Sequence, residues 1–320
     1  MLLRLSNLGR RPVLALQRHI GTYPAKFTTG ASPARREMHF ETLTIETNRS
    51  DAPGVAFVTI NRPRKRNAMN SKFWGECKEV FDTLGEEGEV RAVVLAGAGK
   101  VFTSGLDLSD IGIDLMGGSG SGSDGESVDV ARQAFKIKRH VTRMQEAFNA
   151  IERIPQPVVA AIHGACIGGG IDLIAACDIR YACAETIFSI KEVDIGLAAD
   201  LGTLQRLPRV TGNESLLREL AFTGRNFSSA EGQALGLLSS VLPSPAETLA
   251  RATGLAMEIA RKSPVAVAGT KANLLYSRDH SVQDGLNYMT TWNMAALQSE
   301  DIGKAVQGAM LKETPTFSKL

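Results

Sequence analysis

The stretch Pro157-Val-Val-Ala-Ala-Ile-His163 leads directly into Gly164-Ala-Cys-Ile-Gly168-Gly169-Gly170, and Asp172 follows two residues later. The first part predicts a buried strand because it is a short, continuous apolar run bounded by proline and glycine. Glycine lets a backbone turn tightly and come close to a ligand. The three consecutive glycines therefore predict a sharp turn from the strand into a helix, with Asp172 on the first helical turn.

The start of this helix can stabilise a negatively charged oxygen without a cationic side chain. Its first N–H groups have no partner within the helix and carry partial positive charge. The amide of Gly169 is therefore a candidate for one half of an oxyanion hole. The amide of Leu106 is a candidate for the other half, because the turn Phe102-Thr-Ser-Gly-Leu-Asp107 follows a second strand-like run at 93–95. We expect this turn to lead from a strand into a helix as well, and both loops to form one pocket.

Two more acids complete a group of three. Glu192 follows Asp172 by twenty residues, and Asp200 lies eight residues further, beyond a bend allowed by Gly196. Two carboxylates in one apolar cleft resist joint ionisation, since burial and like-charge repulsion each raise a pKa. The pattern predicts one charged and one protonated acid, which is the pair that proton transfer between two carbon atoms requires.

Each acid has a simpler interpretation when it is taken alone. Acids near glycine-rich turns are more often helix caps or solvated loop residues than catalysts, and Asp172 sits where an acid stabilises a helix dipole. The occurrence of all three acids together with both glycine loops favours a shared site. Asp107, Asp178 and Asp194 lack that support, and we predict that their carboxylates are caps, turn residues or ion-pair partners.

Three motifs resemble the crotonase (enoyl-CoA hydratase/isomerase) superfamily, and nearly the whole mature chain fits that pattern. They are the Phe-x-x-Gly-x-Asp turn at 102–107, the His-Gly-x-x-x-Gly-Gly-Gly loop at 163–170 and the Lys-Glu-x-x-x-Gly-Leu stretch at 191–197. The segment Ile190–Pro208 resembles the Δ3,5-Δ2,4-dienoyl-CoA isomerase branch, in which an aspartate, here Asp200, stands where many hydratases carry glycine. The resemblance implies an α/β fold, a crotonase-type spiral of ββα units followed by a C-terminal helical trimerisation region.

The resemblance also implies a reaction and a role for each acid. Glu192 would be the base that removes a proton from carbon 2 of a 3,5-dienoyl-CoA, Asp200 the acid that returns one at carbon 6, and Asp172 a third carboxylate that tunes or orients them. The oxyanion hole would consist of the Leu106 and Gly169 amides. The substrate contacts would be Ser104, Gly105, Leu106, Asp107, Leu108 and Gly169. No metal, and no cofactor beyond the CoA of the substrate, is implied.

Two other functions stay open at this point. A 2-enoyl-CoA hydratase is the alternative enzyme, although hydratases usually carry glutamate at the position that matches Asp172. A non-catalytic scaffold or RNA-binding member of the fold is the alternative without chemistry. Loss of Asp200 discriminates between the two enzymes, because a hydratase should tolerate it and an isomerase should lose protonation at carbon 6.

Weaker candidates concern the CoA moiety and other chemistries. The segment Asn61-Arg-Pro-Arg-Lys-Arg-Asn-Ala68 resembles the family segment beside the nucleotide end, and its cations either meet phosphates or are solvated surface charge. Lys271 is a weaker candidate still. The glycine spacing does not fit a dinucleotide fingerprint, and His163 is expected to be a structural hydrogen-bonding residue. The cysteines lack zinc-site spacing and are predicted to be reduced and mostly buried: Cys77, Cys166, Cys177 and Cys183.

Charge is distributed unevenly along the 320 residues, of which 43% are hydrophobic. Residues 1–36 hold seven Lys/Arg and no acid, which leaves 29 basic and 34 acidic residues, a net charge of −5, for the rest. The acidic body argues against nucleic-acid binding, and no apolar run approaches the roughly 20 residues of a membrane span. The basic opening predicts a mitochondrial transit peptide, with a disordered basic arm as the alternative. Ser318-Lys319-Leu320 predicts a peroxisomal address read by an import receptor.

These signals predict two locations, the mitochondrial matrix and the peroxisome, and three segments. Residues 1–36 would be the transit peptide, 37–243 the spiral core and 244–320 a helical region that the family uses to form homotrimers or homohexamers. Strands are expected at 39–47, 55–61 and 91–96, and helices at 71–84, 128–154 and from a capping box at Ser244 to about residue 312. The glycine- and serine-rich run at 117–125 predicts a flexible surface loop near the acyl pocket.

Overall fold

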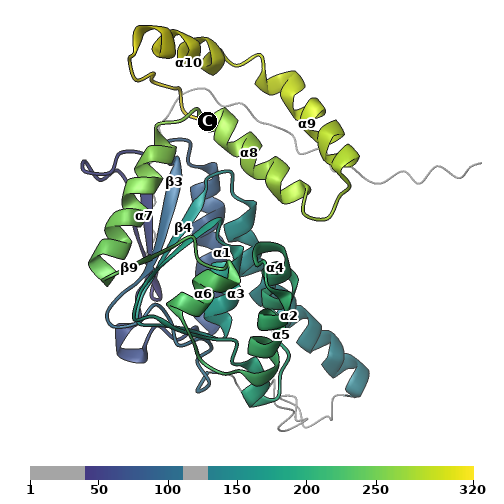
Figure 1. Ribbon diagram of the computed structural model, residues 1–320. Helices are drawn as coiled ribbons and strands as arrows, with labels where there is room; N and C mark the ends of the chain where they lie inside the picture. Colours follow the sequence, from purple (N-terminus) through teal and green to yellow (C-terminus); the bar gives the residue numbers. More distant parts are fainter. Residues whose placement is uncertain (1–39, 111–128) are drawn as a thin grey trace, which may run out of the picture. The chain divides into compact units, whose positions relative to one another are not determined.

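A computed structural model of the chain describes residues 40–110 and 129–320 (Figure 1). His39–Leu320 form one compact unit. The transit peptide at 1–36 and the loop at 117–125 lie outside the described residues, and both stay predictions.

The main sheet of the described residues has six strands in the order β1-β2-β3-β4-β6-β9. β1 is antiparallel to β2, and the other neighbouring strands run parallel. Parallel strands are covered on both faces, which explains why their sequences are continuous apolar runs rather than alternating ones. The strands are β1 (Leu43–Glu46), β2 (Val55–Ile60), β3 (Ala92–Gly97), β4 (Val158–Ile162), β6 (Ile179–Cys183) and β9 (Ser240–Leu242).

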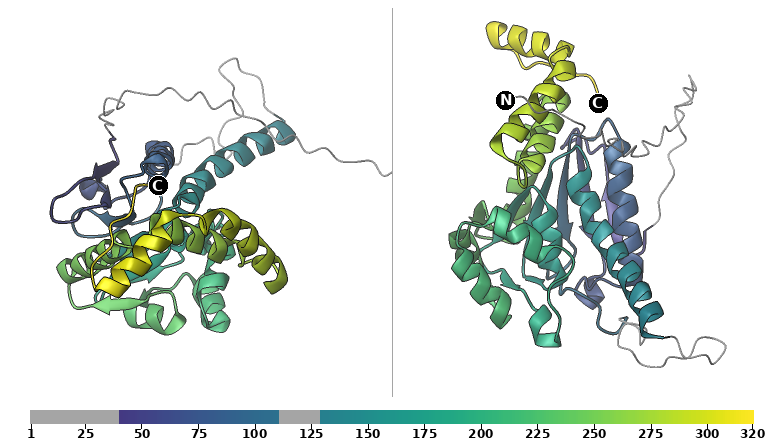
Figure 2. Two further views of the ribbon diagram at one scale, coloured as in Figure 1. Left: turned by 90° about the horizontal axis from the view of Figure 1, so that it is seen from above. Right: turned by 90° about the vertical axis from the view of Figure 1, so that its right-hand side faces the viewer.

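Successive residues of β3 enter two different hydrophobic cores, one on each face of the sheet. Val93 and Leu95 pack into the core that contains α1 (Ser71–Glu86), α2 (Val130–Arg153) and α3 (Gly169–Ala176). Ala92 and Val94 pack into the core on the other face, which α7 (Pro245–Ala260) covers. Figure 1 shows α7 on the opposite side of the sheet from α1 and α3, and Figure 2 shows α1 and α2 running side by side.

A smaller sheet brings the glycine loop and the second acid together. Among the described residues it consists of β5 (Ala165–Ile167), β7 (Ile187–Ser189) and β8 (Phe227–Ser228). β5 and β7 are parallel, and their last pair is Ile167 with Ser189. Because parallel strands end at the same edge, the chain after β5 and the chain after β7 leave the sheet side by side. The amide of Gly168 donates to the Ser189 carbonyl at 2.9 Å, which keeps the two exits in contact.

The C-terminal helices confirm the expected helical region. α8 packs against α9, and the buried Lys271 of α8 pairs with Asp178 at 2.8 Å and donates to the Gln156 carbonyl at 3.0 Å. Lys271 as a CoA contact is therefore wrong, because its ammonium group is buried and already paired. The remaining elements are η1 (Pro63–Lys65), η2 (Glu192–Ile195), α4 (Thr203–Val210), α5 (Glu214–Thr223), α6 (Ser229–Leu235), α7 (Pro245–Ala260), α8 (Pro264–Tyr276), α9 (Val282–Ala296) and α10 (Glu300–Leu311).

Two local expectations need correction. The described part of the turn after β3 does not open a helix: Leu106 forms an isolated bridge with Met69, and the following residues to Asp110 are a turn. The turn instead forms backbone hydrogen bonds with a neighbouring segment. The Met69 N–H donates to the Gly105 carbonyl, and the Asp107 N–H donates to the Met69 carbonyl. At α7, Ser244 caps the helix as predicted. The capping box is incomplete, however, because the Glu247 carboxylate accepts a hydrogen bond from the Ser244 hydroxyl rather than from the Ser244 backbone N–H.

Candidate active site

Asp172 lies in the first turn of α3 and is 1% exposed. Its Oδ1 accepts a hydrogen bond of 2.6 Å from the Thr203 backbone at the start of α4. Burial raises the pKa of Asp172 to about 6, the Thr203 amide opposes that rise, and the charge of Asp200 adds to it. Asp172 is therefore more than a helix cap: its carboxylate joins α3 to α4 and interacts with another of the predicted acids.

Glu192 is the first residue of η2 and is also buried. Within the described part of the chain its Oε2 is buried without a hydrogen-bond partner. Burial first, and then the charges of Asp172 and Asp200, raise the pKa of Glu192 to about 7. A Cβ built at Gly168 would lie 3.3 Å from Glu192 Oε1, so the carboxylate faces the glycine loop. A buried carboxylate without a partner and with a pKa near neutrality is suited to accept a proton from a substrate.

Asp200 lies between Gly196 and α4 and is more exposed than the other two acids. Its backbone carbonyl accepts a hydrogen bond of 2.7 Å from Gln145 of α2. Partial burial raises the pKa of Asp200, and nearby His140 opposes that rise. Because the charge of Asp200 also raises the pKa of Asp172 and of Glu192, the structure brings the three predicted acids into one electrostatic group.

The two glycine loops lie against each other as predicted. Gly105 has φ +85°, and a Cβ built on it would lie 2.6 Å from the Ile167 carbonyl oxygen and 3.5 Å from the Gly169 nitrogen. Thr103 and the β5 strand exchange backbone hydrogen bonds, with Thr103 N–H donating to Ala165 at 3.0 Å. The backbone hydrogen bonds of the described residues include none donated by Leu106 or Gly169, so these hydrogen bonds use neither amide of the predicted oxyanion hole.

The basic segment predicted for CoA lies beside the same turn. The amide of Ser104 donates to the Arg66 carbonyl at 3.0 Å, and the side chains of Arg64, Lys65 and Arg66 are exposed. Arg62 differs, because its guanidinium group pairs with Asp107 at 3.0 Å. Arg62 is therefore already paired with a carboxylate. The exposed side chains of Arg64, Lys65 and Arg66 are the cations of this segment that remain for a ligand lying along the turn.

The acids outside the predicted group of three, and His163, have the structural roles that were expected of them. Asp107 pairs with Arg62, Asp178 with Lys271, and Asp194 with Lys191, as expected of ion-pair partners. His163 forms a hydrogen bond of 3.0 Å with the Gly99 carbonyl.

The thiols also behave as predicted. Cys77, Cys166, Cys177 and Cys183 are free and buried, and burial raises the pKa of the first three. Over residues 40–110 and 129–320, no group of His, Cys, Asp and Glu has the arrangement of a metal site. No helix in these ranges is long and apolar enough to cross a membrane.

Sequence reasoning missed the residues that hold the acids in place. Gln145 belongs to no motif, and Thr203 and Arg206 lie in the segment Ile190–Pro208 but were given no role there. Their role depends on three helices that meet only in the folded chain. One signal was available: Gly202 immediately before Thr203 is typical of a helix start whose amides need an acceptor. Asp172 supplies that acceptor from thirty-one residues away.

Comparisons with known proteins agree with this geometry. Residues 50–319 match a family model described as Enoyl-CoA hydratase/isomerase. The chain is 52% identical over 269 residues to a Homo sapiens protein named "Delta(3,5)-Delta(2,4)-dienoyl-CoA isomerase, mitochondrial", which covers 83% of this chain and 80% of the human one. It is 46% identical over 282 residues to the peroxisomal Arabidopsis thaliana protein of the same activity name, with 88% and 98% covered.

A solved structure extends the agreement to the fold. The crystal structure of enoyl-CoA hydratase from Bacillus anthracis superposes with a TM-score of 0.75 at 27% identity and covers 87% of this chain and 99% of that one. The residues that the family model matches include strands β2 to β9, both glycine loops and the C-terminal helices. Similarity of this extent is more than a shared motif, and the chain belongs to the enoyl-CoA hydratase/isomerase family, the crotonase superfamily.

Proposed function

We propose that the chain converts 3,5-dienoyl-CoA to 2,4-dienoyl-CoA in the β-oxidation of unsaturated fatty acids. The names of its relatives support this reaction. The observation that carries the proposal is Asp200, a third carboxylate whose charge raises the pKa of both Asp172 and Glu192. Hydration acts on two adjacent carbon atoms and needs no acid at a distance. Transfer of a proton from carbon 2 to carbon 6 does.

The proposed reaction moves protons and double bonds without an oxidant or a reductant. Glu192 accepts a proton as the C2–H bond breaks, and the electron pair spreads over carbons 2 to 6 and the thioester oxygen. The amides of Leu106 and Gly169 donate hydrogen bonds to that oxygen and stabilise its charge. Asp200 then donates a proton to carbon 6, which leaves double bonds at positions 2 and 4. A proton returns through water from Glu192 to Asp200 before the next cycle.

The ionisation of the acids supports these roles. With a pKa of about 7, Glu192 is a stronger base than an ordinary glutamate and is still largely ionised just above neutral pH. Asp200 is the more exposed acid in the free chain, and its pKa is already raised by partial burial. A bound acyl chain removes water from Asp200, which raises its pKa further and favours the protonated form that donates.

The same proposal assigns the substrate contacts. Ser104, Gly105, Leu106, Asp107, Leu108 and Gly169 surround the thioester, because their backbones form the two loops in contact. The exposed side chains of Arg64, Lys65 and Arg66 face the phosphates of CoA, with which their charge is complementary. CoA arrives as part of the substrate, and no other cofactor has a role in this chemistry.

An absorbance assay tests the function. The purified chain is mixed with a 3,5-dienoyl-CoA, and growth of the conjugated 2,4-dienoyl thioester is followed in the ultraviolet for the parent, Asp200→Asn and Asp194→Asn. We expect rapid growth in the parent and in the Asp194 variant, whose carboxylate pairs with Lys191 at the surface, and little in Asp200→Asn. Hydration of a 2-enoyl-CoA without any isomerisation would establish the hydratase instead, and inactivity in both assays would favour a scaffold or RNA-binding role.

Assembly and location form part of the proposal. The helices α8 to α10 expose large apolar side chains, which a second copy of the chain would cover in a homotrimer or homohexamer. Light scattering coupled to gel filtration distinguishes these states from a monomer. A mitochondrial and a peroxisomal relative support both locations, with Ser318, Lys319 and Leu320 as the residues that an import receptor would read. The exposed side chains are Leu274, Val282, Leu286, Met294, Leu297, Ile302, Val306, Met310 and Leu311.

A further inference from the structure

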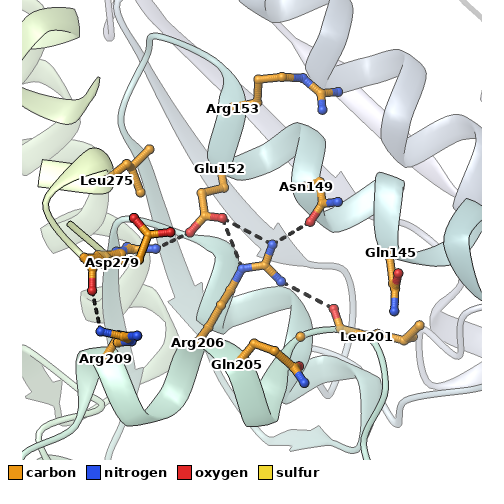
Figure 3. A pocket seen from close by; sticks show the side chains of 12 residues that line it. Gln145, Asn149, Glu152, Arg153, Leu201, Gln205, Arg206, Arg209, Leu275 and Asp279 are labelled. Carbon is orange, nitrogen blue, oxygen red and sulfur yellow. Dashed lines mark hydrogen bonds and ion pairs between the residues drawn. The ribbon is translucent and has the colours of Figure 1, made fainter. Parts of the chain in front are cut away.

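A cleft of about 700 Å³ lies between α2, α4 and the end of α8, next to the segment that carries Asp200 (Figure 3). The three acids do not line it. Its walls include charged side chains from α2, from α4 and from the residues just after α8, and Leu201 and Gly202 form part of its surface. The cleft therefore adjoins the two residues that directly follow the proposed acid.

Arg206 of α4 is the central side chain of the cleft and is only 11% exposed. Its Nη2 donates to Asn149 Oδ1 at 2.7 Å and to Glu152 Oε2 at 3.2 Å, and its Nε donates to the same Glu152 oxygen at 3.3 Å. Its Nη1 donates to the Leu201 carbonyl at 3.4 Å. The planar guanidinium group thus connects α2 to the residue directly after Asp200.

The backbone next to Arg206 is shaped to receive this group. Gly202 has φ +128°, and a Cβ built there would lie 1.9 Å from Arg206 Nη1. A side chain at this position and the guanidinium group in its present place exclude each other. Close contact between Gly202 and Arg206 explains why glycine occupies the second position after Asp200.

Other residues hold the backbone on both sides of the contact between Gly202 and Arg206. Gln145 donates to the carbonyl of Asp200 itself, and Asp172 accepts from the amide of Thr203. Residues 200–203 are therefore anchored at each end and in the middle, by α2, α3 and α4. Within the described residues, the Asp200 carboxylate forms a hydrogen bond with its own backbone amide and interacts with His140, Asp172 and Glu192 only through charge. Its position is consequently set through the backbone.

The same network reaches the C-terminal helical region. Glu152, which accepts from Arg206 through Oε2, pairs through Oε1 with Arg278 just after α8. Arg209 of α4 donates to the backbone carbonyl of Arg278. One carboxylate therefore joins the end of α8 to the arginine that contacts the Asp200 segment.

We propose that Arg206 and Gln145 are positioning residues for Asp200, and that Glu152 links their placement to α8 through Arg278. The inference rests on the proposed function, because it assumes that Asp200 protonates carbon 6. The inference adds that Asp200 is correctly placed only while the cleft network, the contacts made by Gln145, Arg206, Glu152 and Arg278, is intact. Glu192 and the two oxyanion amides are held by other contacts and are independent of the network.

Two rates measured in D₂O separate these steps. Formation of the 2,4-dienoyl thioester requires both acids, whereas exchange of the carbon 2 hydrogen with solvent requires only the base and the oxyanion amides. For Arg206→Lys and for Gln145→Met we expect kcat of isomerisation to fall about 10- to 100-fold, the effect of a misplaced group. KM and the rate of exchange at carbon 2 should change less than about threefold.

Matched variants keep the test specific. Arg153→Lys alters another arginine that lines the same cleft but pairs with Asp82 and Glu146, and it should leave the ratio of the two rates unchanged. Arg278→Met should shift the ratio in the same direction as Arg206→Lys, but less. Equal losses of exchange and isomerisation in Arg206→Lys and Gln145→Met, or a ratio like that of the parent, would refute the positioning role.

Hydrogen exchange of the backbone provides a measurement that does not depend on activity. Peptides that contain residues 200–203 should exchange faster in Arg206→Lys than in the parent, while peptides from α3 that precede the Asp172 contact should not change. Unchanged exchange at 200–203 would overturn the inference. A parent chain that fails to isomerise the dienoyl-CoA would instead defeat the proposed function, and the backbone measurement would still decide whether Arg206 anchors the segment.

Discussion

Replacing Glu192 by glutamine should abolish isomerisation and yet add stability that grows with pH. Glu192 is 7% exposed, and its pKa is about 7 instead of 4.5, chiefly because burial disfavours its charge. An acid with a higher pKa in the folded than in the unfolded chain binds its proton more tightly when folded. Its contribution is therefore most favourable below pH 4.5 and is lost as the pH rises through 7.

The size of the effect follows from the shift. At about 1.4 kcal/mol per pKa unit, ionised Glu192 destabilises the folded chain by about 3 kcal/mol well above neutral pH. Between about pH 5 and pH 8 the loss amounts to roughly 2 to 3 kcal/mol. Glutamine does not titrate, so this pH-dependent loss disappears. The cost of burying an amide in its place is the same at both pH values and cancels in the difference.

Urea unfolding at the two pH values measures the effect, with the fluorescence of buried Trp74 as the signal and protein concentration held constant. The free energy of unfolding of Glu192→Gln relative to the parent should be roughly 2 to 3 kcal/mol more favourable at pH 8 than at pH 5. Asp194→Asn, on the same 3-10 turn but exposed, should differ by less than about 0.5 kcal/mol. If the difference in unfolding free energy between Glu192→Gln and the parent is equal at both pH values, burial does not disfavour the charged form of the carboxylate.

Three further outcomes concern activity. The value of kcat/KM should rise with pH towards about 7 as Glu192 ionises, and a profile that is flat across that range in stopped-flow measurements would contradict its role as base. Asp172→Asn keeps an oxygen for its backbone hydrogen bond but removes a charge that raises the pKa of Glu192; the rising limb should therefore move to lower pH, and an unmoved limb would argue against the interaction. Gly105→Ala should lower kcat about 10²- to 10³-fold by pushing the turn away from Ile167. Gly196→Ala, at a similar φ with nothing within 4 Å, is its control, and equal effects of the two glycine variants would refute close contact of the loops.

Much of the fold could be predicted because it depends on local patterns. The apolar runs at 92–97 and 158–162 are buried on both faces of a parallel sheet, and such strands have no polar side to obscure the signal. The three acids and the two glycine loops could be grouped because their spacing along the chain resembles a known family. In the structure the charges of Asp172 and Asp200 raise the pKa of Glu192, and the charge of Asp200 raises that of Asp172.

The residues that support the acids could not be predicted, and the reason is physical. Gln145 reaches the Asp200 carbonyl across fifty-five residues, and nothing in the local sequence of α2 distinguishes it from a solvated polar residue. Lys271 was the weakest candidate for a CoA contact, and it is buried in an ion pair with Asp178. Such pairings depend on which helices meet, and that is decided by the packing of the whole chain.

The parallel pairing of β3 with β4 determines when the chain becomes active as it folds. Val93 lies beside Val158, so a loop of about sixty residues must close before this pairing forms, and closure costs entropy before any contact repays it. The turn around Leu106 leaves the ribosome well before the glycine loop against which it packs. A half-synthesised chain therefore has no partial activity. Recovery of turnover after dilution from denaturant should report the slowest long-range pairing of the molecule rather than the formation of its helices.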